Sequence, residues 1–209
     1  MPSDRMRRSA AKSPGTNQES GLSWTEVLVA LAIVGILYLL ALPKIVTAFA
    51  RGPCGPMLSN MKQLQLATQQ MAADGETNGD RTLGWPGDTG GTFTNWGRQL
   101  VPAYLSTNDF CKLLSGAGII VPQDRVPQKM SECAILVYAV SRNSPDSAVF
   151  FSSANFTNTA SGGEPLQEDA QPLGNTSFVV LRKGGDGAIL LKKQTGQTNA
   201  IGSYVPLLR

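Results

Sequence analysis

An uncharged apolar segment near the N-terminus limits what this chain can fold into. Residues 27–42 read VLVALAIVGILYLLAL, without a charged side chain. As an α-helix this segment is about 24 Å long, slightly shorter than the hydrocarbon core of a bilayer. The apolar character resumes after Pro43 and Lys44 and continues to Ala50, which makes the whole stretch long enough to span a membrane.

The charges on either side of the segment predict its orientation. Four basic residues precede it, Arg5, Arg7, Arg8 and Lys12. Only Lys44 and Arg51 follow before a long neutral stretch. The positive-inside rule therefore places the N-terminus in the cytoplasm and the chain after Arg51 outside the inner membrane.

Three interpretations of the segment remain open at this point. It is the core of a signal peptide, because residues 48–50 (Ala-Phe-Ala) supply a small-x-small cleavage site and the mature domain would begin at Arg51. Alternatively, it is a plain anchor of a domain that never polymerises. The third interpretation depends on Glu26, since an acid at the threshold of a membrane segment is costly and a signal peptide gains nothing from it.

Five residues in and around the segment have positions that can be counted from one cleavage point. If Gly21 ends a leader and Leu22 begins the mature chain, Glu26 is the fifth mature residue, Gly35 the fourteenth and Pro43 the twenty-second. In this register residues 15–50 resemble the N-terminus of type IV prepilins and of the pseudopilins of type II secretion. The chain departs from that pattern at Leu22, where Phe or Met is usual, at residues 24–25 (Trp-Thr), and in its long leader.

The resemblance implies a structural protein and a set of binding partners. A prepilin peptidase would cut between Gly21 and Leu22 and methylate Leu22. The mature chain would join other pilin or pseudopilin subunits in a filament at an inner-membrane assembly platform, with its helix in membrane lipid before assembly. We favour a type II secretion pseudopilin, with a minor, adhesive or DNA-uptake pilin as the alternative within the family.

Elementary physics gives three of these residues a role. After cleavage Leu22 carries a cationic amino group, and the Glu26 carboxylate can pair with it where water is scarce, in the same or a neighbouring helix. Because an unpaired buried charge costs several kcal/mol, such a pair would set the axial register between subunits. Pro43 lacks an N–H and is expected to kink the helix.

The rest of the chain predicts an α+β head over residues 51–209, after a leader (1–21) and an assembly helix (22–50). We expect a break at residues 51–56 and then an amphipathic helix whose apolar face is Met57, Met61, Leu64 and Met71. Short helices are expected at 95–105 and 107–114, the second capped by Thr107 or Asn108. This pattern is typical of one helix packed on an antiparallel sheet of three to five strands.

The strands of that sheet are predicted from β-branched and aromatic runs. Residues 134–140 and 148–151 read as buried strands, and 176–182 and 188–192 flank a Lys-Gly-Gly-Asp-Gly hairpin turn. Residues 204–209 are expected to add an edge strand. Residues 152–175 are rich in Ser, Asn, Thr and Gly and predict a long loop.

Two further groups of residues are candidate sites. Asp74, Glu76 and Asn78 match the first half of a calcium-binding EF-hand loop, but Trp85 occupies the closing position, so we favour a solvated acidic turn within a loop over 74–98. Of the three cysteines, Cys111 and Cys133 are candidates for a disulfide outside the inner membrane, which would leave Cys54 free. Three buried thiols are the alternative.

Composition excludes several function classes. The net charge is only +3, too small to indicate a nucleic-acid partner. The chain has no histidine, which excludes Ser-His-Asp and Cys-His catalysis and every His-ligated metal site. It also lacks phosphate-binding glycine motifs. We therefore predict a non-enzymatic protein with no cofactor, apart from the calcium candidate above.

Overall fold

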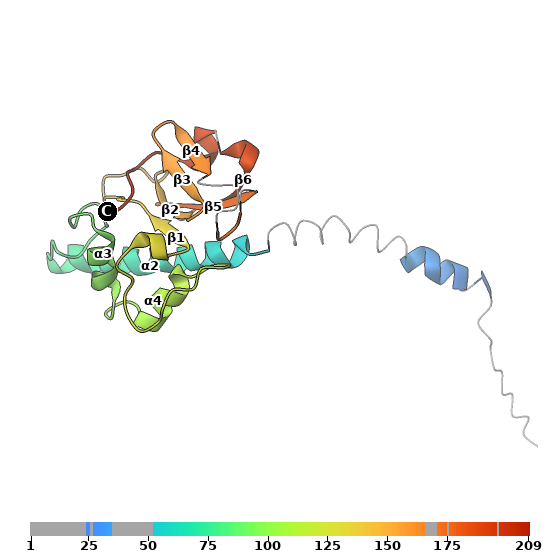
Figure 1. The fold of residues 1–209 in the computed structure, drawn as a ribbon, viewed down its shortest axis with the longest axis horizontal. Coiled ribbons are helices and arrows are strands. Elements are labelled where there is room, and N and C mark those ends of the chain that lie inside the picture. The colour runs from blue at the N-terminus through green and yellow to red at the C-terminus, as the bar shows by residue number, and fades with distance from the viewer. Residues whose placement is uncertain (1–23, 26, 35–51, 166–170, 175, 196) are drawn as a thin grey trace, which may run out of the picture. The chain divides into compact units, whose positions relative to one another are not determined.

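The computed structural model describes residues 24–25, 27–34, 52–165, 171–174, 176–195 and 197–209 (Figure 1). The chain divides into two compact units, Met1–Ala48 and Phe49–Arg209. In the first unit, residues 24–25 and 27–34 are helical. The remainder of the predicted hydrophobic helix lies outside the described residues. Among the helices that are described, none combines the length and the apolar character needed to cross a membrane.

The second unit begins with a long helix, α2 (Cys54–Asn78). Its apolar face is the predicted one, because Met57, Met61, Leu64 and Met71 are all buried. The predicted break at 51–56 is wrong in extent, since α2 already includes Pro56. A proline is tolerated in the first turn of a helix, where the missing N–H has no helical partner to bond.

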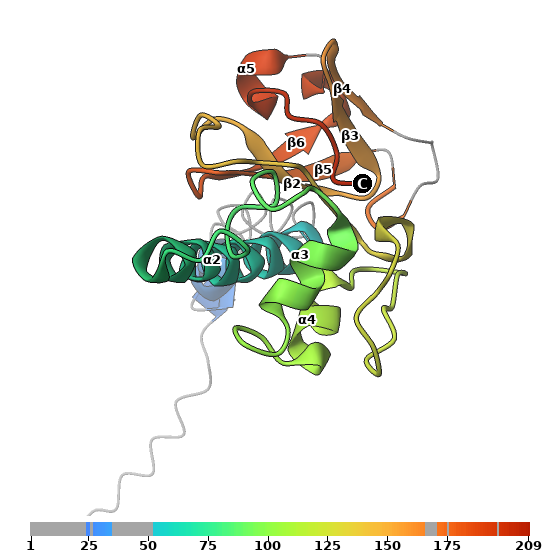
Figure 2. The same ribbon diagram turned by 90° about the vertical axis from the view of Figure 1, so that its left-hand side faces the viewer.

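The sheet of the head is antiparallel and four-stranded, in the order β1-β2-β5-β6. The strands are β1 (Ile135–Val137), β2 (Val149–Ser153), β5 (Ser177–Arg182) and β6 (Gly187–Leu191). Helix α2 lies along one face of this sheet (Figure 2). The α+β head, with an amphipathic helix on an antiparallel sheet, is therefore confirmed, as is the β5–β6 hairpin.

A second hairpin corrects the predicted loop over 152–175. Strand β3 (Phe156–Thr159) pairs with β4 (Gly162–Pro165) in a separate two-stranded sheet. The ring of Phe156 lies 5.4 Å from that of Phe178 on β5, so the hairpin contributes to the core despite its polar sequence. After β6, a short 3-10 helix (Lys192–Gln194) leads to α5 (Thr198–Ile201), which lies beside this hairpin (Figure 2).

Two short helices complete the head on the side of α2: α3 (Phe93–Leu100) and α4 (Thr107–Leu114). A 3-10 turn, Met130–Glu132, precedes β1. The bounds of α4 match the prediction, but its N-cap is Ser106, whose Oγ accepts a hydrogen bond from the Asp109 N–H at 3.1 Å. Helix α3 begins and ends earlier than predicted, and the loop expected over 74–98 is confined to 79–92.

The core joins the helices to the sheet through Trp96. Its ring lies 5.6 Å from Phe110 of α4 and 6.0 Å from Phe151 of β2, and its Nε1 donates to Thr68 Oγ1 of α2 at 3.2 Å. One buried indole on α3 thus contacts three other elements. Burying such an aromatic contributes several kcal/mol to folding, and pairing its N–H removes the cost of an unsatisfied donor.

The C-terminal residues lie beside the end of β1 through an isolated antiparallel bridge, Tyr138–Leu207, and do not form the edge strand that the sequence predicts. The Ala139 N–H donates to the Pro206 carbonyl at 2.8 Å, and the Leu208 N–H donates to the Val137 carbonyl at 2.9 Å. Phe93, the first residue of α3, donates to the Arg209 carbonyl at 2.7 Å. The last residues are therefore held between the sheet and a helix N-terminus.

Candidate functional site

The residues predicted to direct processing and assembly are Gly21, Leu22, Glu26 and Pro43, and all four lie outside the described residues. The helical stretch 27–34 that follows Glu26 is described. Its apolar side chains Leu28, Leu31 and Val34 are 54%, 62% and 62% exposed. The described part of this helix therefore carries an exposed apolar surface.

The calcium candidates occupy a helix rather than a loop. Asp74, Glu76 and Asn78 lie in the last turns of α2. The Asp74 carboxylate accepts a hydrogen bond from Tyr104 Oη at 3.0 Å, and Glu76 forms an exposed ion pair with Arg142 at 2.7 Å. Across the described residues, no cluster of three carboxylate, cysteine or histidine side chains is arranged to hold a metal ion.

All three cysteines are buried as thiols. The Cys111 thiol donates to the Arg125 carbonyl at 3.3 Å, and the Cys133 thiol to the Lys129 carbonyl at 3.8 Å. Burial raises the pKa of Cys133 to about 12, with smaller contributions from the charges of Glu132 and Cys111. The reduced thiol is therefore protonated and unreactive at neutral pH. The Cys111–Cys133 disulfide stays a prediction.

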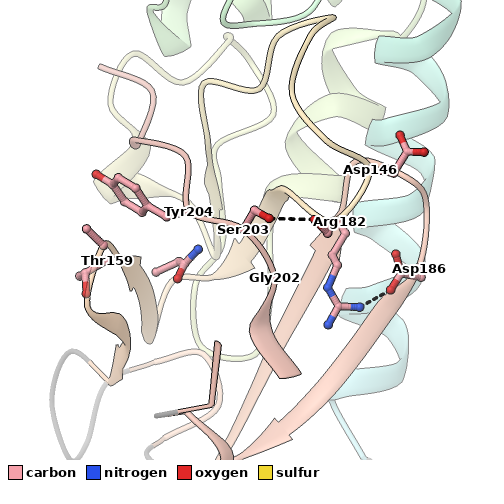
Figure 3. Close-up of a pocket in the computed structure, with 10 residues that line it drawn as sticks. Asp146, Thr159, Arg182, Asp186, Gly202, Ser203 and Tyr204 are labelled. Carbon is pink, nitrogen blue, oxygen red and sulfur yellow. Dashed lines mark hydrogen bonds and ion pairs between the residues drawn. The ribbon is translucent and has the colours of Figure 1, made fainter. Parts of the chain in front are cut away.

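The structure also contains a pocket that the sequence did not predict, of about 610 Å³, at the end of the sheet near α5 (Figure 3). The side chains that line it come from four separate segments. They include Asp146, Ser147, Asn158, Thr159, Arg182 and Tyr204. No local pattern links positions so far apart in the chain, so only the tertiary fold reveals this site.

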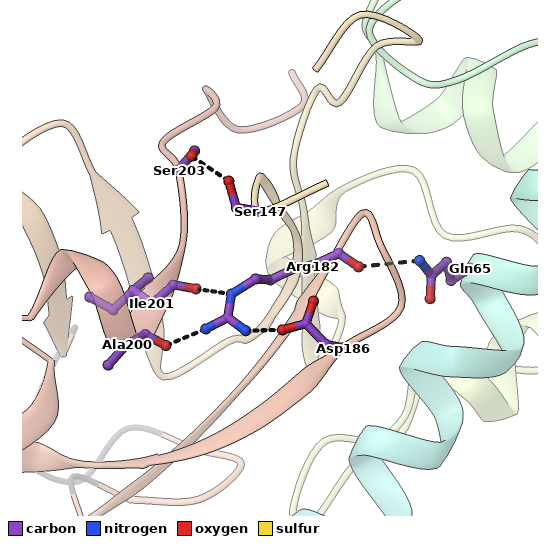
Figure 4. Close-up of polar contacts among 7 residues, drawn as sticks. All are labelled: Gln65, Ser147, Arg182, Asp186, Ala200, Ile201 and Ser203. Atoms are coloured by element: carbon purple, nitrogen blue, oxygen red, sulfur yellow. Dashed lines mark hydrogen bonds and ion pairs between the residues drawn. The ribbon is translucent and has the colours of Figure 1, made fainter. Parts of the chain in front are cut away.

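Arg182 fixes one wall of this pocket (Figure 4). Its side chain is only 14% exposed. Its Nε donates to the Ile201 carbonyl at 2.9 Å, one terminal nitrogen donates to the Ala200 carbonyl, and the other pairs with Asp186. The guanidinium thus joins β5 to the end of α5, and its charge is balanced inside the protein. Fixed, charge-compensated walls suit a preorganised binding site.

The floor of the pocket lies at Gly202 and Ser203. Gly202 has a φ of +123°, and a Cβ there would lie 2.3 Å from the Ser147 carbonyl oxygen. Only glycine fits this approach. Beside it, the hydroxyls of Ser147 and Ser203 bond to each other at 2.8 Å. Among the described residues, the hydrogen bond of each of these hydroxyls is to the other serine and not to a base that would activate a nucleophile.

A second pocket, of about 740 Å³, lies at the C-terminal end of α2. Three of its polar residues bond to each other: Glu76 pairs with the Arg142 guanidinium, and the Arg142 main-chain N–H donates to Asp88 Oδ2 at 2.8 Å. The centre of the Trp85 ring lies 5.5 Å from Lys183 Nζ. It also lies 5.5 Å from the centre of the Phe150 ring, in an edge-to-face arrangement. Each of these groups therefore has a partner within the head.

Comparison with known proteins gives one partial similarity. The chain matches no protein-family model and no solved structure. It is 30% identical over 69 residues to a curated protein of Dichelobacter nodosus. That relative is the type IV major fimbrial protein FimA. The similarity covers 33% of this chain and 44% of the fimbrial protein, so the chain spans less than half the length of the relative that it matches.

Proposed function

We propose that this protein is a pilin-like structural subunit of a filament, specifically a type II secretion pseudopilin. The observation that carries the proposal is the register of Gly21, Glu26 and Pro43 around an apolar segment, in a chain that is partly similar to a type IV fimbrial protein. A prepilin peptidase cleaves after Gly21 and methylates Leu22. The mature helix then resides in the inner membrane, with the head in the periplasm, until an assembly platform adds the subunit to the filament.

The exposure of residues 27–34 supports this proposal. Leu28, Leu31 and Val34 lie at helical spacing, and each is more than half exposed. Val29 and Ile33, on the adjacent face, are 59% and 53% exposed. Lipid covers such a helix before assembly, and neighbouring helices cover it within a filament.

Glu26 is the residue that distinguishes assembly from simple anchoring. In a helix bundle, its carboxylate pairs with the amino group of Leu22 on the same or a neighbouring subunit. Removing the carboxylate leaves a buried cation without a partner, which costs several kcal/mol at each subunit contact. Anchoring and cleavage do not need this pair.

The second candidate function is an exported binding domain that begins near Arg51 after signal-peptide cleavage. Residues 48–50 favour it because they form a small-x-small cleavage site. The unit Phe49–Arg209, with its own core, also fits a protein of this kind. In that case neither Gly21 nor Glu26 has a role.

Crosslinking in intact source cells tests the proposal. We compare the wild-type chain with Glu26→Ala and with a matched control, Glu19→Ala, which changes an acid inside the leader. The wild type and Glu19→Ala are expected to give ladders of crosslinked subunits. Glu26→Ala should be processed normally yet remain outside the ladder. Ladders of equal strength from Glu26→Ala, or none from the wild type, would contradict the proposal.

A further inference from the structure

We infer that the pocket beside Arg182 binds a neutral saccharide. This inference concerns the head alone and does not depend on the filament proposal. A volume of about 610 Å³ falls within the range of small-molecule sites, roughly 300–1,000 Å³. Its polar lining groups are the hydroxyls of Ser147 and Ser203, which bond to each other, and the Thr159 hydroxyl, which donates to the Gly162 carbonyl and can still accept. An amide at Asn158 and a carboxylate at Asp146 complete the polar lining.

The charges around the pocket favour an uncharged ligand. Asp186 is paired with Arg182, and the guanidinium is also bonded to two carbonyls. An anionic ligand would have to displace Asp186 from Arg182. One carboxylate, that of Asp146, remains at the rim, which suits the acceptance of hydrogen bonds from ligand hydroxyls better than the neutralisation of a charged group.

Tyr204 supplies an apolar surface beside these polar groups. The residue is 49% exposed, and in Figure 3 it lies with Thr159 on one side of the pocket, with Asp146 and Asp186 on the other. A sugar ring presents C–H groups on one face and hydroxyls around its edge. It can therefore pack against the tyrosine ring while its hydroxyls bond to the facing polar groups.

Asn158 gives a second, independent reason for a ligand here. The residue lines the pocket, is only 4% exposed, and its Nδ2 has no hydrogen-bond partner among the described residues. Buried amide donors are nearly always paired in folded proteins. The Nδ2 atom has almost no accessible surface, so a ligand hydroxyl can accept its hydrogen bond only after the amide turns toward the pocket.

The larger pocket at the end of α2 lacks these features. Its carboxylates Glu76 and Asp88 are bonded within the head, and the ring of Trp85 is in contact with both Lys183 and Phe150. The pocket beside Arg182 instead offers an exposed ring, a rim carboxylate and an unpaired amide.

Saturation-transfer NMR on the full chain tests the inference. The detergent must carry no sugar head group. The probes are glucose, galactose and N-acetylglucosamine, each up to about 20 mM, because single-sugar sites commonly bind in the millimolar range, where a Kd of about 1 mM corresponds to about −4 kcal/mol. We expect transfer to at least one sugar. Absence of transfer to all three would overturn the inference.

Paired variants locate the binding. Tyr204→Ala and Asp146→Ala should each weaken the affinity by about tenfold or more, a factor equal to about 1.4 kcal/mol. Ile120→Ala and Asp124→Ala, at exposed positions outside the pocket lining, are the matched controls and should bind as the wild type does. Unchanged binding by Tyr204→Ala, or an equal loss in Asp124→Ala, would place the sugar elsewhere and contradict the inference.

Discussion

The side-chain amide of Gln65 on α2 donates to the main-chain carbonyl of Arg182 at 3.2 Å (Figure 4) and to that of Lys183 at 2.5 Å, at the turn of the β5–β6 hairpin. Gln65 is 3% exposed, so this amide is a buried polar link between the helix and the sheet. It satisfies two carbonyls that would otherwise face the surface of α2.

Replacing this amide should loosen the contact between helix and sheet. We expect Gln65→Ala to lower the free energy of unfolding by about 1–3 kcal/mol, because it leaves the hairpin carbonyls without their donor. Gln63→Ala, on the exposed face of the same helix, should change it by less than about 0.5 kcal/mol. Urea unfolding followed by tryptophan fluorescence measures both, and equal effects would refute a special role for Gln65.

The floor of the pocket makes a second prediction, based on backbone geometry. Gly202→Ala places a Cβ against the Ser147 carbonyl at a positive φ. The substitution should therefore lower the free energy of unfolding by at least about 1–3 kcal/mol. Gly55→Ala is the matched control. It lies in the first turn of α2, and a Cβ added there would meet no atom within 4 Å, so it should be neutral or stabilise by up to about 1 kcal/mol. Thermal unfolding of the two variants should therefore shift in different directions or by clearly different amounts.

The cysteines of the head make a third prediction, for protein taken from an oxidising compartment. The Ala134 N–H donates to the Leu114 carbonyl at 2.8 Å, which brings the segments carrying Cys133 and Cys111 side by side. We expect a Cys111–Cys133 disulfide, with Cys54 as the free thiol. The protein is denatured in the presence of an alkylating agent that blocks free thiols. Peptide mapping under non-reducing conditions then detects the disulfide. Alkylation of all three cysteines in the wild type would rule this disulfide out.

The reduced chain should lose stability in alkali. The pKa of Cys133 is raised from 9.0 to about 12 in the folded state, chiefly by burial. Between these two values the unfolded thiol ionises while the folded one stays protonated, so rising pH favours unfolding. The stability of the fold with the Cys133 thiol buried is thus fully present below the pKa of the unfolded state. It is lost as the pH rises toward the pKa of the folded state. Cys133→Ala should show a shallower decline of the thermal midpoint over this range than the exposed-site control Ser131→Ala.

Local periodicity predicted the elements of the head whose structure depends on burying one apolar face. The spacing of Met57, Met61, Leu64 and Met71 is sufficient to predict α2 and the face that it buries. The glycine-rich turn between Arg182 and Gly187 similarly predicted the β5–β6 hairpin, because such turns favour two antiparallel strands.

The parts that the sequence did not predict depend on distant contacts. The β3–β4 hairpin is polar, and its place in the core depends on Phe156 meeting Phe178, which lies in another strand. The pocket beside Arg182 likewise forms only when Asp146, Asn158 and Tyr204 are brought together by the fold. In contrast, the proposed processing site at Gly21 is a purely local motif, which sequence can detect without a structure.

The mass of the mature protein from native membranes tests the central proposal most directly. We predict a chain that begins at Leu22 and carries one additional methyl group on its amino terminus. A Gly21→Ser variant should accumulate with its leader attached, while Gly15→Ser, a matched glycine change within the leader, should be processed as the wild type is. A wild-type chain that begins at Arg51, or one that retains residues 1–21, would contradict prepilin processing.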